Sequence, residues 1–114
     1  MHELSIVTHL VDTAESFAKQ MNARKVDFLE VEIGEATGVI SKYVRMYYPD
    51  VTKDTLLEGS DLRIEESEYL VFCKNCGRTF HPESRKAFCP SCGVYGDFDV
   101  LQGDTLTLKQ IGYE

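Results

Sequence analysis

The only cysteines of the chain form two Cys-x-x-Cys pairs with twelve residues between them, at Cys73, Cys76, Cys89 and Cys92. Two such pairs at this separation are typical of a site in which four thiolates hold one metal ion. A glycine follows the second cysteine of each pair, and glycine permits the tight turn that directs backbone amides at the sulfur atoms. Because four thiolates leave no position open for water, we expect a structural zinc or iron ion and not a catalytic one. A disulfide or a redox-active pair fits less well, since two matched pairs usually bind a metal.

The amino terminus, Met1-His2-Glu3, is a second set of residues that could bind a metal. The α-amine, the His2 amide nitrogen and the His2 imidazole can close fused chelate rings on one ion. A nitrogen or oxygen atom of Glu3 could then complete a square, and a planar array of nitrogen and oxygen donors favours Ni(II) or Cu(II). Taken alone, however, these three residues are more typical of a frayed terminus.

Length and composition narrow the function classes. A chain of 114 residues is one domain, or one domain with a small metal-bound appendage, and a hydrophobic content of 43% is that of a globular protein. The sequence contains neither an apolar run long enough to cross a bilayer nor a signal peptide, and it lacks a glycine-rich phosphate-binding loop. Metal-bound thiolates suit a reducing compartment. We therefore expect a cytoplasmic protein that is not an enzyme and does not bind membranes.

The charge is distributed unevenly along the chain. The net charge is −7, yet the segment between Cys73 and Cys92 carries a local +3, which leaves −10 for the rest. An acidic body argues against nucleic acid as the main partner, because phosphate contacts need a basic surface. The basic segment could still contact an acidic protein or RNA.

Hydrophobic periodicity predicts the elements that must position these residues. Apolar residues at helical spacing predict a helix over about 4–21 and a second over about 38–48, which Pro49 should end. Residues 50–60 read as a loop or a single helical turn. Alternating apolar residues predict short strands at about 26–33, 62–65, 98–101 and 106–111.

These elements predict an α+β fold, with two helices on a small three-stranded sheet and an inserted zinc-ribbon-like module. The last strand is too short to stand alone and should return to the first sheet. Residues 1–68 and 101–114 would then form a discontinuous α+β domain, and residues 69–100 the zinc-binding module.

The inserted module should depend on its metal. It offers few residues for a core of its own, namely Phe72, Phe80, Phe88, Tyr95 and Phe98. So small a core cannot offset the conformational entropy of about thirty residues, and metal binding must supply the folding energy. His81 lies between the cysteine pairs, and with four thiolates available we interpret it as a surface residue.

The order of four short motifs resembles that of the HypA (HybF) family, nickel chaperones for the maturation of nickel–iron hydrogenases. These motifs are Met-His-Glu at the start of an amphipathic helix, Val31 to Glu35, Leu62 to Glu66 before the first cysteine pair, and Gly103 to Leu108. The likeness covers essentially the whole chain.

The resemblance implies a protein that delivers nickel. Nickel, as transient cargo, would be held by His2, by backbone nitrogens of His2 and Glu3, and by the Glu3 side chain, with the terminal amine of Met1 as a candidate donor. Structural zinc would be held by Cys73, Cys76, Cys89 and Cys92. The implied partners are the maturation GTPase HypB and the hydrogenase large subunit, and in some organisms urease and its accessory proteins.

Two alternatives from other classes share the cysteine pattern. A rubredoxin-like electron carrier has similar cysteine pairs, but it leaves the acidic helix–strand part without a role, and its iron site would be red and redox-active. A zinc-ribbon adaptor in transcription or translation is supported only by the basic segment, and salt-dependent binding of nucleic acid would reveal it.

Overall fold

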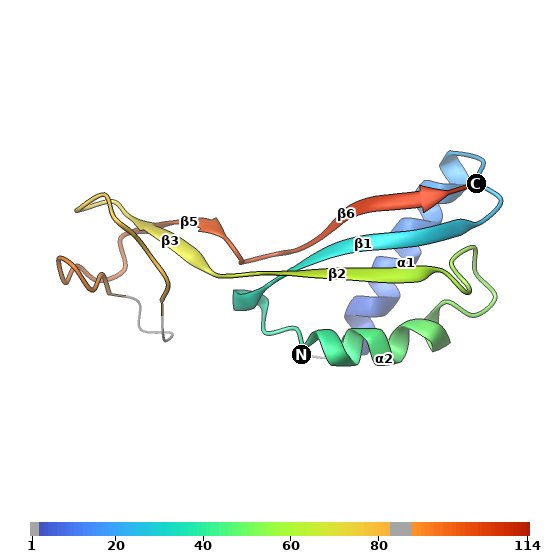
Figure 1. Cartoon of the computed structure of the whole chain (residues 1–114), viewed down its shortest axis with the longest axis horizontal. Helices are drawn as coiled ribbons and strands as arrows, with labels where there is room; N and C mark the ends of the chain where they lie inside the picture. The colour runs from blue at the N-terminus through green and yellow to red at the C-terminus, as the bar shows by residue number, and fades with distance from the viewer. Residues whose placement is uncertain (1–2, 83–87) are drawn as a thin grey trace.

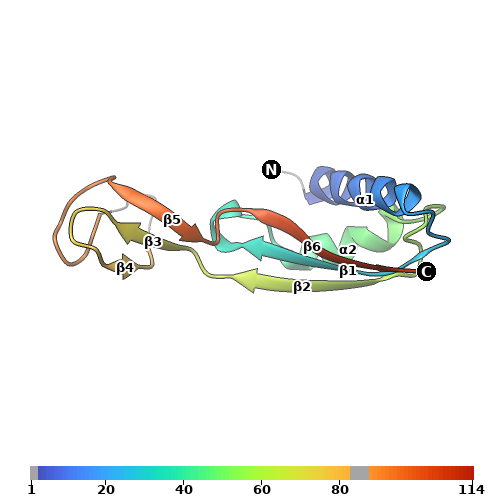
Figure 2. The ribbon, with the colours of Figure 1, turned by 90° about the horizontal axis from the view of Figure 1, so that it is seen from above.

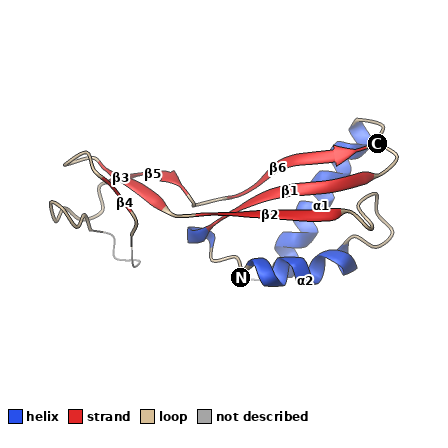
Figure 3. Ribbon diagram, viewed as in Figure 1, coloured by secondary structure: helices blue, strands red, loops and turns tan. Residues whose placement is uncertain are grey.

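Two small sheets lie one after the other along the long axis of an elongated molecule that measures 54 × 25 × 16 Å (Figure 1). The computed structural model describes residues 3–82 and 88–114. The first sheet has the strand order β2-β1-β6 and the second has the order β4-β3-β5. In the described residues, the helices all lie at the first sheet or at its junction with the second (Figure 3).

The first sheet joins distant parts of the chain. Its central strand β1 (Val26–Gly34) is parallel to β2 (Asp61–Ser67) and antiparallel to β6 (Leu106–Tyr113). The register places Leu29 opposite Leu62 and Ile111, so apolar side chains from three strands form one row on one face. The predicted return of the last strand to the first sheet is therefore confirmed, as is the α+β fold.

Two helices cover one face of this sheet (Figure 2). Helix α1 (Glu3–Gln20) packs on β1 and β6, and α2 (Ser41–Val51) packs on β2. The apolar stripe predicted for the first helix is buried along its length at Val7, Leu10, Val11, Ala14 and Ala18. Three further apolar residues of this region, Leu4, Phe17 and Met21, are exposed, and Phe17 packs edge-on against Tyr113.

The second helix differs from its prediction at both ends. A 3₁₀ turn, η1 (Glu35–Thr37), and Gly38 in the left-handed region (φ 73°) come first, so α2 begins at Ser41. The helix also continues past Pro49 to Val51. Pro49 lies in the last turn, where its missing N–H removes a single helical bond, and the N–H of Thr52 donates to the Tyr48 carbonyl at 3.0 Å.

The segment between α2 and β2 is a series of turns, as predicted, but it also supplies a core residue. Leu57 is completely buried in the cluster beneath the helices. The Leu56 N–H donates to a carboxylate oxygen of Glu15 at 2.9 Å, and the Leu56 carbonyl accepts from the Val26 N–H at 2.8 Å. These bonds hold the turns against α1 and β1, which is why a polar-looking loop contributes to the core.

The second sheet is smaller. Its central strand β3 (Leu70–Cys73) is antiparallel to both β4 (Thr79–Phe80) and β5 (Phe98–Gln102). Phe80 and Phe98 pack edge to face with ring centroids 5.0 Å apart. The prediction that Phe88 and Tyr95 would belong to a core is wrong, because they are 55% and 69% exposed. An isolated bridge pairs them at the surface, and the core of this sheet is correspondingly thin.

Two glycines allow the close crossing of chains between the sheets. Gly103 follows β5 with φ 86°, and a Cβ atom there would overlap the backbone of Glu68 and Tyr69. A Cβ atom on Gly34, at the end of β1, would overlap the carbonyl of Gly103. The strands that leave the first sheet therefore pass within backbone contact of each other.

Candidate metal centres

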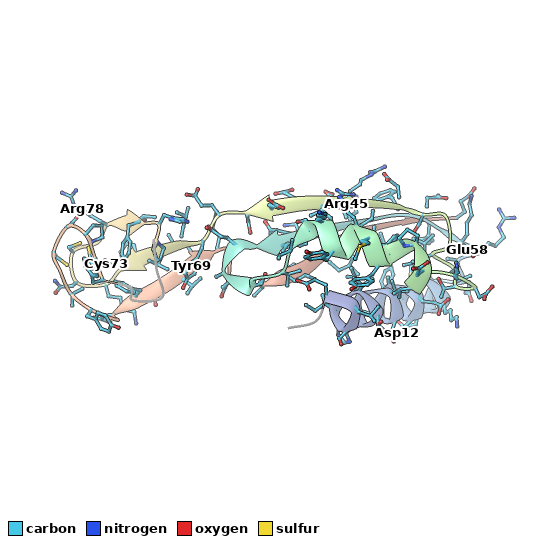
Figure 4. All side chains as sticks on the ribbon, turned by 90° about the horizontal axis from the view of Figure 1, so that it is seen from below. Asp12, Arg45, Glu58, Tyr69, Cys73 and Arg78 are labelled. Atoms are coloured by element: carbon cyan, nitrogen blue, oxygen red, sulfur yellow. The ribbon has the colours of Figure 1, made fainter. Side chains whose placement is uncertain are left out.

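The four cysteines gather at the end of the molecule that lies farthest from the carboxyl terminus (Figures 1 and 4). Their sulfur atoms all lie within 4.8 Å of one another, with 3.7 Å between Cys73 and Cys92 and 3.5 Å between Cys76 and Cys89. All four are free thiols. A tetrahedral zinc site with bonds of about 2.3 Å places its sulfur atoms about 3.8 Å apart. The donor set and its spacing therefore fit a metal tetrathiolate.

The two cysteine pairs adopt the same backbone conformation. In the first pair, the Gly77 N–H donates to the Cys73 carbonyl at 2.8 Å, and the Cys73 N–H donates to the Arg78 carbonyl at 2.8 Å. The same two bonds recur sixteen positions later, at 2.8 and 2.9 Å. Gly77 and Gly93 both have left-handed φ angles, 77° and 78°. The predicted tight glycine turns are thus present, and each wraps a backbone loop around its sulfur atoms.

The environments of the sulfur atoms are not uniform. The first cysteine of each pair is buried, whereas the second, Cys76 or Cys92, is exposed. The Asn75 side-chain amide donates to the Cys92 sulfur at 3.4 Å. This bond is the main cause that lowers the pKa of the Cys92 thiol to about 6, and the Val94 N–H contributes next. Since metals bind thiolates, a sulfur that ionises readily suits a ligand.

His81 lies outside the cysteine cluster and pairs with the first sheet. Its Nε2 atom is 2.8 Å from Oε1 of Glu35, and the same oxygen accepts the Tyr69 N–H at 2.9 Å. The Tyr69 amide, and then His81, hold the pKa of the Glu35 carboxyl below its usual range. Sequence reasoning missed this role of Glu35, because its partners lie 34 and 46 positions away and no local pattern links them.

Of the predicted nickel ligands, Met1 and His2 lie outside the described residues, and Glu3 is the first residue of α1. Oε2 of Glu3 accepts the N–H of Ile40 at 3.3 Å, just before α2 begins. The Glu3 side chain therefore joins the start of one helix to the start of the other. Glu3 begins α1 at the first sheet, whereas the cysteines lie at the second sheet, so Glu3 is not part of the cysteine cluster (Figure 1).

An acidic cleft lies next to this attachment point. It has a volume of about 530 Å³ and runs from Ile40 to the junction of the sheets. Its walls carry three carboxylates, those of Glu35, Glu66 and Glu68. The Ser41 hydroxyl donates to Glu66 at 2.6 Å. The surface next to Ile40, which the Glu3 side chain contacts, is thus rich in carboxylates.

The fold and the cysteine cluster define a small, two-sheet metal-binding protein of the α+β class. Residues 1–113 match the sequence model of a family described as "Hydrogenase/urease nickel incorporation, metallochaperone, hypA". The chain belongs to this HypA family, as its motifs predicted. In the described part of the chain, no helix is both long enough and apolar enough to span a membrane.

Curated relatives agree with the family match, and a solved structure shares the fold. The chain is 35% identical to the hydrogenase maturation factor HypA of Geobacter metallireducens over the whole of both chains. It is 36% identical to that of Methanocella arvoryzae, over 100% of this chain and 99% of the relative. The solution structure of the Ni metallochaperone HypA from Helicobacter pylori has a TM-score of 0.70 at 24% identity, covering 99% of this chain and 97% of the other.

Family membership decides the broad class. HypA proteins are metallochaperones that act in hydrogenase maturation and are not enzymes, in agreement with the sequence-based prediction. A full-length match of this kind favours that class over the rubredoxin-like electron carrier and the zinc-ribbon adaptor, which account for the cysteine pairs alone.

Proposed function

We propose that this protein binds Ni(II) at its amino terminus and delivers it to the large subunit of a nickel–iron hydrogenase. In this proposal Zn(II), held by Cys73, Cys76, Cys89 and Cys92, is structural. The observation that carries the proposal is the match of residues 1–113 to a family of nickel metallochaperones.

The start of α1 is chemically suited to hold nickel through nitrogen atoms. The first four N–H groups of a helix have no acceptor within the helix, so the Glu3 amide can coordinate an ion without breaking a helical bond. One oxygen of the Glu3 carboxylate accepts the Ile40 N–H, which favours the backbone nitrogens of His2 and Glu3, the His2 imidazole and the Met1 amine as the main ligands. A planar set of such donors selects Ni(II) or Cu(II).

The position of the site favours both the uptake and the transfer of nickel, and acid favours its release. The acidic cleft beside Ile40 raises the local concentration of cations, while a terminal ligand set can move toward an acceptor at small cost. The α-amine, with a reference pKa of about 8, and the imidazole, at about 6.5, must lose protons to coordinate. Nickel affinity should therefore fall as the pH falls through this range.

The structural role of zinc follows from the thin core of the second sheet. Phe88 and Tyr95 are exposed, so the residues around the cysteines bury little apolar surface. A tetrathiolate closes the coordination shell and supplies folding free energy directly. Metal-bound thiolates of this kind suit the reducing cytoplasm, where we expect the protein to act.

The proposed partners are those implied by the family. We infer that the GTPase HypB and the hydrogenase large subunit bind this chain, and that urease accessory proteins do so in organisms that make urease. The family description, which names both hydrogenase and urease, supports this inference.

A Ni(II) titration of tag-free protein, followed by calorimetry and absorption, tests the nickel site. We expect one nickel per chain in the wild type and loss of that binding in His2→Ala, with the zinc content unchanged in both. His9→Ala is the matched control, because it removes a histidine of α1, outside the proposed ligand set, and should leave nickel binding intact.

Equal nickel binding by the wild type and His2→Ala, or none by either, would contradict the terminal site. Zinc content measured in the same samples tests the second metal separately. A red, redox-active protein would instead indicate iron at the cysteines.

A further inference from the structure

The two cysteine pairs share a backbone but differ in one side chain. The residue before the second cysteine is Asn75 in the first pair and Ser91 in the second. The Asn75 amide reaches from its own pair to the other and donates to the Cys92 sulfur at 3.4 Å. The bond therefore links the two halves of the cluster through side chains, independently of any metal.

This bond makes the two exposed thiolates unequal. The Arg78 N–H donates to Cys76 and the Val94 N–H donates to Cys92, so each of the two sulfur atoms has one backbone donor. Cys92 has the Asn75 side chain in addition. In the described part of the chain, the partners of the Cys76 sulfur are the Arg78 amide and the neighbouring thiols.

The difference has a chemical consequence. An N–H donor draws electron density from a thiolate and orients it, and partners of this kind tune the affinity of metal sites. Both Cys76 and Cys92 are exposed, so solvent access does not distinguish them. The sulfur with fewer donors retains more of its charge and is the stronger nucleophile.

We propose that Asn75 is a positioning residue of the zinc site, which clamps the two cysteine pairs together and protects the Cys92 sulfur, so that electrophiles attack Cys76 first. This inference rests on the proposed structural zinc. With iodoacetamide, the Cys76 sulfur forms a bond to the methylene carbon while the carbon–iodine bond breaks and iodide leaves with the bonding electron pair. The product is a neutral thioether, a weak ligand, and zinc is then lost to water.

The experiment uses the zinc-loaded full chain with limiting iodoacetamide. Zinc release is followed with a chromogenic chelator, and the order of alkylation is read by peptide mass mapping. In the wild type we expect Cys76 to be modified before Cys92. In Asn75→Ala the two rates should converge, and zinc affinity should fall by about 10-fold or more.

Two further variants and a spectrum test whether Asn75 acts on the Cys92 sulfur or only stabilises the fold. Asn75→Asp keeps the shape but replaces the donor with a negative charge, and should release zinc faster than Asn75→Ala. Ser91→Ala, at the equivalent position, should behave like the wild type. In Co(II)-substituted protein, the sulfur-to-cobalt charge-transfer band should move to longer wavelength in Asn75→Ala and stay in place in Ser91→Ala.

The outcomes distinguish the role of Asn75 from the structural zinc on which that role depends. One zinc per chain with Cys92 modified first, or with the same order and spectrum in Asn75→Ala, overturns the role of Asn75 alone. Protein that binds no zinc at all overturns the structural zinc and the role of Asn75 with it.

Discussion

The side chain of Glu35 joins the first sheet to the second. Its Oε1 atom accepts the Tyr69 N–H at 2.9 Å and lies 2.8 Å from Nε2 of His81. These two partners lower the pKa of the carboxyl, with the Tyr69 amide as the larger cause. A lowered pKa means that the carboxylate stabilises the fold fully above the ordinary value of 4.5. That contribution is lost as the pH falls through the lowered value.

We predict that His81→Ala raises the pKa of Glu35 part of the way toward 4.5, since the larger contribution from Tyr69 remains. The measurement is an NMR titration of the Glu35 side-chain carboxyl carbon in the wild type and the variant. Zinc content is followed in parallel, because loss of zinc would displace His81 as well. The same midpoint in both proteins would show that His81 does not act on Glu35.

At the scale of elements, the path of the strands depends on the glycines where the sheets meet. Gly34 ends β1 and Gly103 follows β5, and a Cβ on either would overlap backbone atoms that cannot move aside as a side chain could. The chain passes through this crossing twice, from β2 to β3 and from β5 back to β6. Close backbone contact at these glycines therefore constrains the geometry between the sheets, together with the bonds that Glu35 makes.

We predict that Gly103→Ala destabilises the protein more than Gly59→Ala does. Both glycines have left-handed φ angles, 86° and 78°, which cost an alanine about 1–2 kcal/mol. A Cβ on Gly59 meets nothing within 4 Å, whereas one on Gly103 overlaps Glu68 and Tyr69. Urea denaturation of the two variants measures the difference, and equal losses would mean that the crossing can relax.

At the scale of the whole molecule, we propose that residues 1–68 and 101–114 form one domain and residues 69–100 a metal-dependent second one. The described core cluster beneath α1 and α2 draws its residues from the first part alone. The second sheet has little core beyond Val71 and the buried cysteines. The first part should therefore keep its structure when the metal is removed.

Cys73→Ser tests this division. We expect loss of zinc and of the dispersed NMR signals of β3, β4 and β5, while signals from α1, β1 and α2 persist. Wild-type protein treated with a zinc chelator is the matched control and should give the same pattern. Collapse of both sets of signals together would contradict the division and indicate a single cooperative unit.

Local patterns in the sequence determined the cysteine cluster, the long first helix and the positions of most strands. Each of these depends on residues a few positions apart, whose spacing decides which side chains share a face or a turn. The glycine after each cysteine pair could be predicted in the same way, because the left-handed φ angle of the turn that it occupies favours glycine.

Only the tertiary structure decided features that join distant residues. Nothing around Leu57 distinguishes a core residue from a loop residue until α1 and β1 close over it. Pro49 is tolerated because the end of α2 happens to lie there, and Phe88 and Tyr95 are exposed because the second sheet is too small to cover them. The bond between Glu35 and His81 and the bond from Asn75 to Cys92 likewise exist only once folding has brought separate segments together. The physical reason is that periodicity shows which side of a helix or strand is apolar, whereas tertiary packing decides which other element that side contacts.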